Sequence, residues 1–269
     1  MSVFVQQTGT ECEFGSSDSW VILSPIEQSI KRKIEAVGTP LKDWDIQINY
    51  GIKTGYNDAF IIDTSKRDEI LANCQTEDER KRTEELIRPI LRGRDIKRYG
   101  YNWANLWLIN THNGIRGKLE RVHIEDYPAI KTHLDQYWDR ISKRADKGDT
   151  PYNLRNCAYL EDFYKPKLFY ADITQRLNFC LCNDVMFCNN TTYFMVMKNG
   201  SSFPTYFQEY LNSKLIDWYY RTLSVQLGEK AVRMFSIYVL NIPIPKCIKG
   251  NIYETYGLTS EEVDFIENH

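Results

Sequence analysis

The segment GIKTGYNDAFIID (residues 51–63) decides the predicted fold of this chain, together with IRPILRGRDIKRY (residues 87–99). An alternating apolar run leads into the first segment and Ala59–Ile62 leaves it, so we expect two strands joined by a glycine-rich loop. Lys53 and Thr54 lie in that loop, where glycines let the backbone approach a ligand closely. An ammonium group and a hydroxyl are natural partners of a phosphate or a base edge.

The second segment concentrates positive charge around one glycine. Residues 80–98 contain eight lysines and arginines against three acids, whereas residues 246–269 contain two lysines against five acids. This asymmetry favours one face turned towards nucleic acid, although the whole chain has a net charge of −2. The single acid of the segment, Asp95, leaves an alternative open: a structural Arg–Asp pair that leaves only Lys97 and Arg98 for DNA.

Each segment also has an ordinary structural interpretation. A Gly-x-x-x-Gly turn is more often a hairpin connection, and this one lacks the ending of a phosphate-cradling loop. A short basic run is usually a solvated face. The order in which the two segments occur with later motifs favours a functional interpretation.

Those later motifs give the two segments a family context. They are KGDTPYNLR (residues 147–155), KPK (165–167), LNSKL (211–215) and IPIP (242–245). With them, the chain from Trp20 to Pro245 resembles the TaqI-type C-terminal specificity domain, the target-recognition part of adenine-specific DNA methyltransferases and of fused type IIG/IIS restriction-modification enzymes. The resemblance implies site-specific binding of double-stranded DNA, with methyl transfer and any cleavage carried out by an upstream module. That module would use S-adenosylmethionine, and Mg²⁺ if it is also a nuclease.

The resemblance and the residue chemistry together give a set of candidate DNA contacts. Cations would fix the register on the phosphates, and loop side chains would contact base edges in the major groove. This orientation would present one adenine for flipping into the upstream module. The predicted DNA-binding residues are Lys53, Thr54, Arg92, Arg94, Lys97, Arg98, Arg155 and Gln175.

We assign no catalytic or metal-binding residue from the sequence. The chain lacks the Asn/Asp-Pro-Pro-Tyr/Phe loop and the glycine-rich cofactor turn of adenine methyltransferases, so we expect no cofactor in this chain. Cys180, Cys182 and Cys188 have the wrong spacing for zinc and are expected to be buried as small hydrophobic residues. No apolar run approaches the roughly 20 residues of a membrane helix, and no export signal is recognisable, so we expect a cytoplasmic protein.

The pattern of elements predicts an α+β fold, with a mixed, largely antiparallel sheet and interleaved helices. Ser24 and Glu27 form a capping box for a helix that ends at Gly38. Other helices are expected at residues 77–88, 124–145 and 206–223, and strands at 3–6, 20–23, 103–110, 168–173, 178–182 and 193–197. We expect lead-in strands and a connecting helix in residues 1–50, the DNA target-recognition domain in 51–245, and an acidic C-terminal tail in 246–269.

Other classes of function stay open at this point. A DNA-specificity subunit of a multi-subunit restriction or phage-defence system would carry long coiled-coil helices between two similar halves, and no such repeat is visible. A self-contained nuclease or transferase with an unrecognised site would show turnover without a partner. A protein-interaction role in phage defence would be marked by indifference to DNA at low salt.

Overall fold

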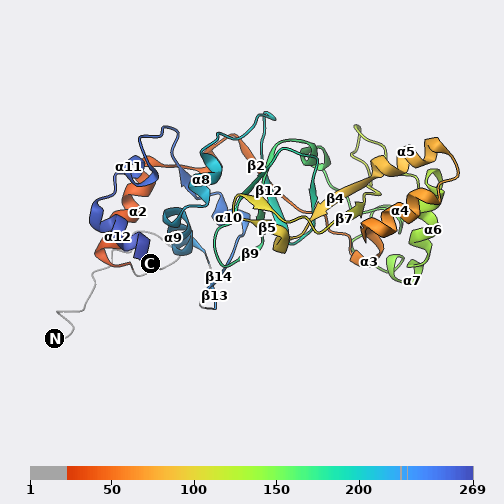
Figure 1. Ribbon diagram of the computed structural model, residues 1–269, viewed down its shortest axis with the longest axis horizontal. Helices are drawn as coiled ribbons and strands as arrows, with labels where there is room; N and C mark the ends of the chain where they lie inside the picture. Colours follow the sequence, from red (N-terminus) through yellow and green to blue (C-terminus); the bar gives the residue numbers. More distant parts are fainter. Residues whose placement is uncertain (1–22, 225, 229, 269) are drawn as a thin grey trace. The chain divides into compact units, whose positions relative to one another are not determined.

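The computed structural model describes residues 23–224, 226–228 and 230–268 of the chain (Figure 1). Helices and mostly antiparallel strands are interleaved along these residues, which confirms the α+β prediction. The strand predicted at residues 3–6 and most of the one at 20–23 lie outside the described residues. Within the part of the chain that is described, no helix is long and apolar enough to cross a membrane.

The chain folds into two compact units, each built from separate stretches of sequence. Of the described residues, unit 1 contains those of 23–45, Thr174–Leu177 and 205–268, and unit 2 contains Ile46–Ile173 and Asn178–Pro204. The short strand β9 (Ile173–Thr174) lies at the boundary. The three domains predicted from the sequence stay a prediction.

Unit 1 is mainly helical. Its first helix, α2 (Pro25–Val37), begins as predicted, because the backbone N–H of Ser24 donates to the Glu27 carboxylate at 2.8 Å. β1 pairs with β15, and β13 pairs with β14, both antiparallel. The other elements are β1 (Thr39–Pro40), η1 (Leu41–Asp43), α8 (Phe207–Leu211), α9 (Lys214–Leu223), β13 (Gln226–Leu227), β14 (Ala231–Arg233), α10 (Ser236–Val239), β15 (Pro243–Ile244), α11 (Ile252–Tyr256) and α12 (Ser260–Asn268).

The single helix predicted over residues 206–223 is wrong, since the structure has two helices there, α8 and α9. Ser213 separates them: its hydroxyl accepts a hydrogen bond from the backbone N–H of Ile216 at 3.1 Å and caps α9. A serine in this position favours a helix start over a continuous helix, because its side chain replaces a missing intrahelical acceptor.

The acidic C-terminal residues form α11 and α12 and are joined to α2 by a buried carboxylate. Glu262 of α12 accepts hydrogen bonds from the Ser29 hydroxyl at 2.7 Å and from the Lys33 ammonium group at 2.6 Å. Burial alone would raise the pKa of Glu262, but these bonds and one from the Thr259 N–H hold the pKa at about 2.

Unit 2 contains two four-stranded sheets. In the first, ordered β10-β8-β12-β2, all neighbours are antiparallel. In the second, ordered β11-β4-β7-β3, β11 runs parallel to β4 and the other pairs are antiparallel. The strands predicted at 103–110, 168–173, 178–182 and 193–197 are thereby confirmed, the first three with fewer residues and the last with one residue more. The strands are β2 (Ile46–Tyr50), β3 (Ile61–Asp63), β4 (Ile87–Leu91), β7 (Leu106–Ile109), β8 (Lys167–Ala171), β10 (Cys180–Cys182), β11 (Phe187–Cys188) and β12 (Thr192–Met197).

The helices of unit 2 gather beside β4 and β7 (Figure 1). A small hairpin of β5 and β6 follows β4 after one turn of 3₁₀-helix, η2. These elements are α3 (Asn57–Phe60), α4 (Thr64–Ala72), α5 (Glu77–Leu86), α6 (Pro128–Asp135), α7 (Trp138–Ile141), η2 (Gly93–Asp95), η3 (Ile124–Asp126), η4 (Leu160–Tyr164), β5 (Ile96–Lys97) and β6 (Gly100–Tyr101).

The long helix predicted over residues 124–145 is wrong, because the structure breaks it into η3, α6 and α7. Tyr127 precedes Pro128 and has φ −130° and ψ 64°, outside the helical region. Proline disfavours a helical conformation of the residue before it and lacks the N–H that would continue the helix. The apolar periodicity continues across this break, which is why the sequence predicted one continuous helix.

The strand predicted at Ala59–Ile62 is also partly wrong. Ala59 and Phe60 end α3, and only residues 61–63 form β3. β3 pairs with β7, whereas β2 pairs with β12, so the segment between them is not a hairpin connection. The helix predicted at residues 77–88 ends at Leu86, because β4 begins at Ile87.

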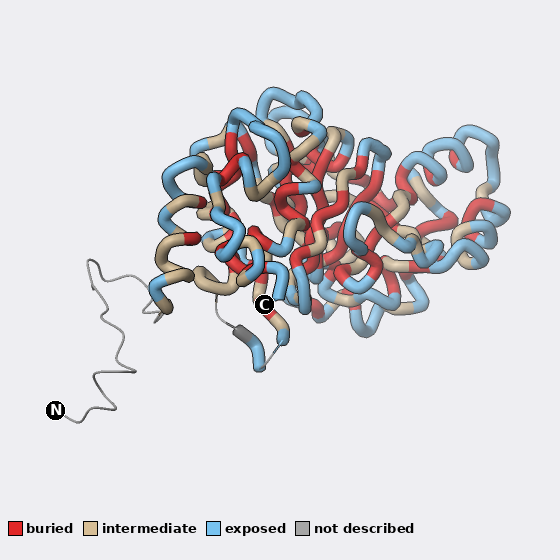
Figure 2. The backbone as a smooth tube through the Cα atoms, turned by 60° about the vertical axis from the view of Figure 1, so that its left-hand side comes forward, coloured by how far each residue is buried: buried red, intermediate tan, exposed pale blue. Residues whose placement is uncertain are grey.

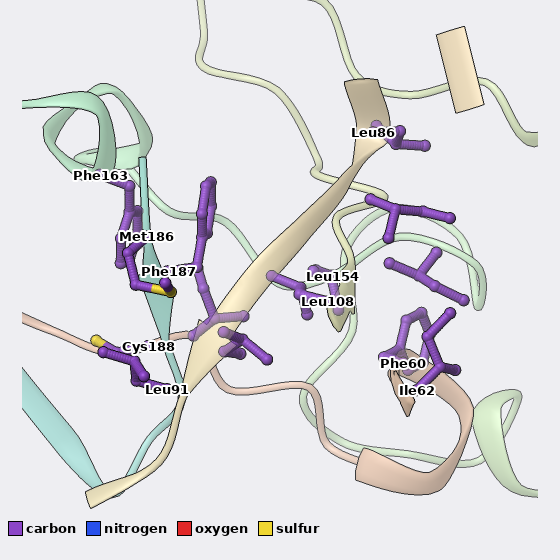
Figure 3. Packing of buried hydrophobic residues seen from close by; sticks show 14 of the residues in the cluster. Phe60, Ile62, Leu86, Leu91, Leu108, Leu154, Phe163, Met186, Phe187 and Cys188 are labelled. Carbon is purple, nitrogen blue, oxygen red and sulfur yellow. The ribbon is translucent and has the colours of Figure 1, made fainter. Parts of the chain in front are cut away.

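The core of unit 2 is formed by buried residues of its strands together with residues of the helices and loops that pack on them, and Figure 2 shows buried residues along much of the tube. Phe163 stacks on Phe187 with ring centroids 4.4 Å apart, and Cys188 lies beside them near β4 (Figure 3). Cys180 and Cys182 are buried as well, as expected for small hydrophobic residues. Burial raises the pKa of all three thiols, so these cysteines stay protonated.

Candidate nucleic-acid interface

One turn, residues 189–192, contacts both of the glycine-containing segments that the sequence singled out. On one side, the backbone N–H of Gly51 donates to Thr192 O at 2.9 Å and that of Ile52 to Cys188 O at 2.7 Å. A Cβ at Gly51 would lie 1.9 Å from Asn189 O, so only glycine fits. Gly51 therefore lets another part of the protein's own backbone come close, and not a ligand.

The other side of the same turn holds Gly93. The Gly93 N–H donates to Thr191 Oγ1 at 2.8 Å, and a Cβ at Gly93 would lie 2.5 Å from Thr191 O. The Thr191 hydroxyl in turn donates to the buried Asn189 side chain at 2.7 Å. The Asn189 side chain thus makes hydrogen bonds that are common in turns. The loop after Gly51 and the turn after Arg92 both pack against residues 189–192.

The turn that contains Gly93, residues 92–99, will be called the basic turn. The Arg92 guanidinium donates to both oxygens of Asp95, at 2.9 and 2.8 Å, and the Arg92 N–H donates to the same carboxylate at 2.8 Å. Burial would raise the pKa of Asp95, but these bonds outweigh it and hold the pKa below its usual value. Arg92 is only 23 % exposed, so the pair holds the turn together, as the structural alternative predicted. That alternative left only Lys97 and Arg98 for DNA, whereas the structure leaves Arg94 exposed too.

The remaining cations of the basic turn face solvent. Arg94, Lys97 and Arg98 are all exposed. Lys97 Nζ donates to the Arg94 carbonyl at 2.8 Å, and the Arg98 guanidinium lies 5.2 Å from the ring centroid of Tyr99. Tyr99 is itself half exposed and has φ +70°. The turn thus displays three positive side chains and one aromatic ring.

Lys53 and Arg155 share a single acid, Asp146, in what will be called the Asp146 cluster. Lys53 Nζ lies 2.8 Å from Asp146 Oδ2, and Arg155 NH1 lies 3.3 Å from Oδ1. The fold therefore brings together two predicted DNA-binding residues that are far apart in sequence. Both cations are about half exposed, whereas the carboxylate is only a quarter exposed.

A buried arginine that the sequence did not single out supports this cluster. The Arg144 guanidinium donates to the carbonyls of Thr54, Asp146, Pro151 and Asn153, and lies 4.4 Å from the ring centroid of Phe60. Burial lowers the pKa of Arg144 to about 10. No sequence signal could reveal this role, because backbone carbonyls of any residue type can accept these bonds.

Two predicted site residues are placed differently from the rest. Thr54 is 2 % exposed, and its hydroxyl donates to the Asn57 side chain at 2.7 Å. Gln175 is exposed but belongs to unit 1, where its carbonyl accepts a hydrogen bond from Arg221. The Thr54 hydroxyl is therefore used inside its own loop, and a DNA-binding role of Gln175 stays a prediction.

Comparison with known proteins gives a family match and several similar solved structures, two of which are described here. Residues 88–244, more than half of the chain, match the TaqI-like C-terminal specificity domain family. No curated protein matches. The chain is similar to the type IIL restriction-modification enzyme MmeI, whose structure was determined in complex with DNA, with a TM-score of 0.53 and 14 % identity over 81 % of this chain and 27 % of that one. It is also similar to the type IIG restriction endonuclease BpuSI, with a TM-score of 0.47 and 14 % identity over 91 % of this chain and 28 % of that one.

The likeness to MmeI, at this identity, shows a shared fold. The chain spans about a quarter of the length of these two enzymes. The family match begins at Arg88, so it includes the basic turn and the segment 147–155 and is shorter than the resemblance from Trp20 to Pro245. From this match, the chain belongs to the TaqI-like C-terminal specificity domain family.

Proposed function

We propose that this chain is the DNA target-recognition part of a restriction-modification enzyme. Family membership supports a specificity role, and the fold shared with MmeI, a restriction-modification enzyme solved with DNA, is consistent with it. The observation that carries the proposal is the basic turn. Arg92 pairs with the only acid of the turn, Asp95, and Arg94, Lys97 and Arg98 are exposed, so the surface of the turn is positively charged.

The basic turn and the Asp146 cluster would act on the sugar–phosphate backbone and not on the bases. Arginine and lysine bind phosphates by charge-assisted hydrogen bonds, which position a protein on duplex DNA without sequence preference. The basic turn packs against residues 189–192 through Gly93, and Lys53 of the Asp146 cluster follows Gly51 and Ile52, which bond to the same region. Backbone packing therefore fixes the spacing between the basic turn and Lys53. Fixed spacing of phosphate contacts would set the register of the duplex.

The chemistry would belong to a different module of the same enzyme. That module would methylate an adenine with S-adenosylmethionine and, if it also cleaves, would use Mg²⁺. The role of this chain would be to bind and orient the duplex so that one adenine can be flipped out of the stack.

The proposal is tested by the salt dependence of duplex binding, measured by fluorescence anisotropy with the full chain. In a triple variant with Arg94, Lys97 and Arg98 changed to alanine, the slope of log K against log salt should fall in magnitude by about 2 to 3, since each lost phosphate contact removes about 0.9. The matched control changes Arg80, Lys81 and Arg82, three exposed cations of α5, to alanine. It removes the same charge and should keep the wild-type slope.

Two results would overturn the proposal. One is the absence of duplex binding by the wild-type chain at low salt. The other is an equal loss of slope in the control, because net charge alone would then explain the binding.

A further inference from the structure

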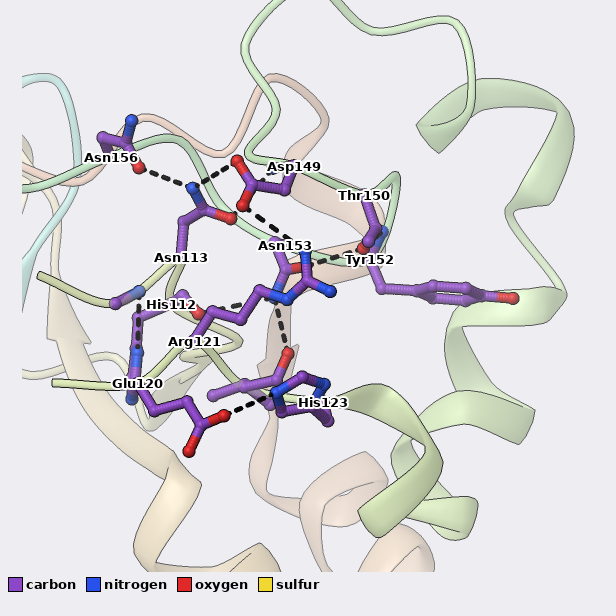
Figure 4. A network of polar contacts seen from close by, with 12 residues as sticks. His112, Asn113, Glu120, Arg121, His123, Asp149, Thr150, Tyr152, Asn153 and Asn156 are labelled. Carbon is purple, nitrogen blue, oxygen red and sulfur yellow. Dashed lines mark hydrogen bonds and ion pairs between the residues drawn. The ribbon is translucent and has the colours of Figure 1, made fainter. Parts of the chain in front are cut away.

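The segment 147–155, which carries part of the family resemblance, braces a neighbouring loop. Asn153 is 2 % exposed, and its side-chain amide donates to Val122 O at 2.9 Å while its amide oxygen accepts from the Thr150 hydroxyl at 2.6 Å (Figure 4). The Leu154 N–H donates to Thr111 O at 2.8 Å. The segment therefore fixes the residues on both sides of residues 113–121, which will be called the 113–121 loop.

A second set of bonds holds the two ends of this loop to Asp149. Asn113 and Asp149 exchange hydrogen bonds at 2.9 and 3.0 Å, and Arg121 NH1 lies 3.3 Å from Asp149 Oδ2 (Figure 4). Asn113 also donates to Asn156 at 2.6 Å. A Cβ at Gly148 would lie 2.4 Å from Asn113 Oδ1, so the loop packs against this segment without space for a side chain.

Beyond these contacts the loop closes into a tight turn with one isolated β-bridge, between Ile115 and Leu119. Ile115 and Leu119 exchange backbone hydrogen bonds at 2.8 and 2.9 Å, and the Lys118 N–H also donates to Ile115 O at 2.9 Å. Gly114 and Gly117 have φ of +73° and +74°, which lets the chain reverse within a few residues. The two sides of the loop are thus held together by backbone hydrogen bonds just below its tip.

The tip of this turn carries two cations, Arg116 and Lys118, on either side of Gly117. Arg116, Gly117 and Lys118 are exposed, and a Cβ at Gly117 would have no atom within 4 Å. Lys118 lies 3.9 Å from Glu161, but both side chains are about two-thirds exposed (67 % and 64 %), so this pair constrains Lys118 little. The hydrogen-bonded ends of the 113–121 loop therefore hold a small, positively charged tip in solvent.

We propose that the 113–121 loop enters the major groove of DNA and that Arg116 contacts a guanine there. The inference rests on the proposed function and adds a base contact to its phosphate contacts. The major groove is wide enough for a helix or a two-stranded ribbon and therefore has room for this tight turn. Arginine is the side chain that binds the O6 and N7 of guanine with two hydrogen bonds. Lys118, at the other side of the tip, contacts a phosphate. The bracing by Asn113, Asp149 and Asn153 supplies the rigid support that a specific contact needs.

The test is selection of bound duplexes from a randomised library by the full wild-type chain, followed by affinity measurement of variants on the selected site. Arg116→Gln should lose preference for one G·C pair, with Kd on the selected site rising about 5- to 150-fold, the range for one bidentate base contact. Its Kd for random duplex should change far less. Lys118→Ala should weaken binding to all duplexes equally.

Arg140→Gln is the matched control, because Arg140 is an exposed arginine of α7 in the same unit and leaves the loop intact. Circular dichroism and thermal melting check that each variant folds. Selection of an unchanged site by Arg116→Gln with unchanged Kd, or an equal loss on all sequences, would overturn the inference. Duplex binding without any preferred sequence would also overturn it while leaving the proposed function in place. No duplex binding at all would remove both.

Discussion

Replacing Asp146 by asparagine should strengthen duplex binding. The Asp146 carboxylate holds Lys53 on one oxygen at 2.8 Å and Arg155 on the other at 3.3 Å. Because both cations are proposed to contact phosphates, the carboxylate competes with DNA for them. Asparagine keeps the Asp146 backbone carbonyl that accepts from Arg144, so the support of the loop is retained.

The size of the effect follows from the exposure of the two pairs. Lys53 and Arg155 are about half exposed, so each ion pair contributes about 0.5 kcal/mol after screening by water. Releasing both makes about 1 kcal/mol available for binding, which corresponds to a roughly fivefold lower Kd at low salt. The slope of log K against log salt should also steepen by about 1 to 2, since each cation newly engaged with a phosphate adds about 0.9.

The assay is anisotropy of a labelled duplex with Asp146→Asn, the wild type and Asp139→Asn. Asp139 is an exposed acid of α7, so its replacement changes the net charge equally without touching the cluster. Only Asp146→Asn should bind more tightly. An unchanged or higher Kd for Asp146→Asn, or equal tightening by Asp139→Asn, would refute competition between this carboxylate and DNA.

The remaining predictions concern stability. Arg92→Ala leaves the buried Asp95 without its partner and should lower the free energy of unfolding in urea by about 2 to 4 kcal/mol, whereas Arg94→Ala should stay within about 0.5 kcal/mol. Arg144→Met leaves four backbone carbonyls without their donor and should cost at least about 3 kcal/mol in the same measurement. The pKa of Glu262, lowered to about 2 in the fold, should make its stabilisation complete above pH 4.5 and lost as the pH falls from 4.5 to 2. Glu262→Gln should therefore flatten the acid side of a plot of melting temperature against pH, and an unchanged plot would contradict the role of this carboxylate.

Local sequence signals predicted the elements whose stabilising contacts are close in sequence. Ser24 and Glu27 are three residues apart, and their capping box starts α2 as expected. The pairing of Arg92 with Asp95 spans the same distance and was foreseen as an alternative. Pro128 was available as a local signal for the break in the predicted long helix, but apolar periodicity was given more weight.

Contacts between distant segments could not be predicted in this way. Asn189 packs on Gly51 across more than a hundred residues. Gly51 was predicted to allow the approach of a ligand because the sequence does not show which backbone comes close. Asp146 pairs with Lys53 across a similar gap. Family membership was foreseen from motif order, but the motif residue Asn153 braces the 113–121 loop, a role that only the fold reveals.

Hydrogen exchange of the full chain, with and without duplex DNA at low salt, tests most directly whether this chain binds DNA through the basic turn. Amides of residues 92–99 and of the 113–121 loop should exchange more slowly when the duplex is present, and those of α5 and α12 should not change. Protection confined to α5 or α12, or no protection anywhere, would contradict the proposed interface.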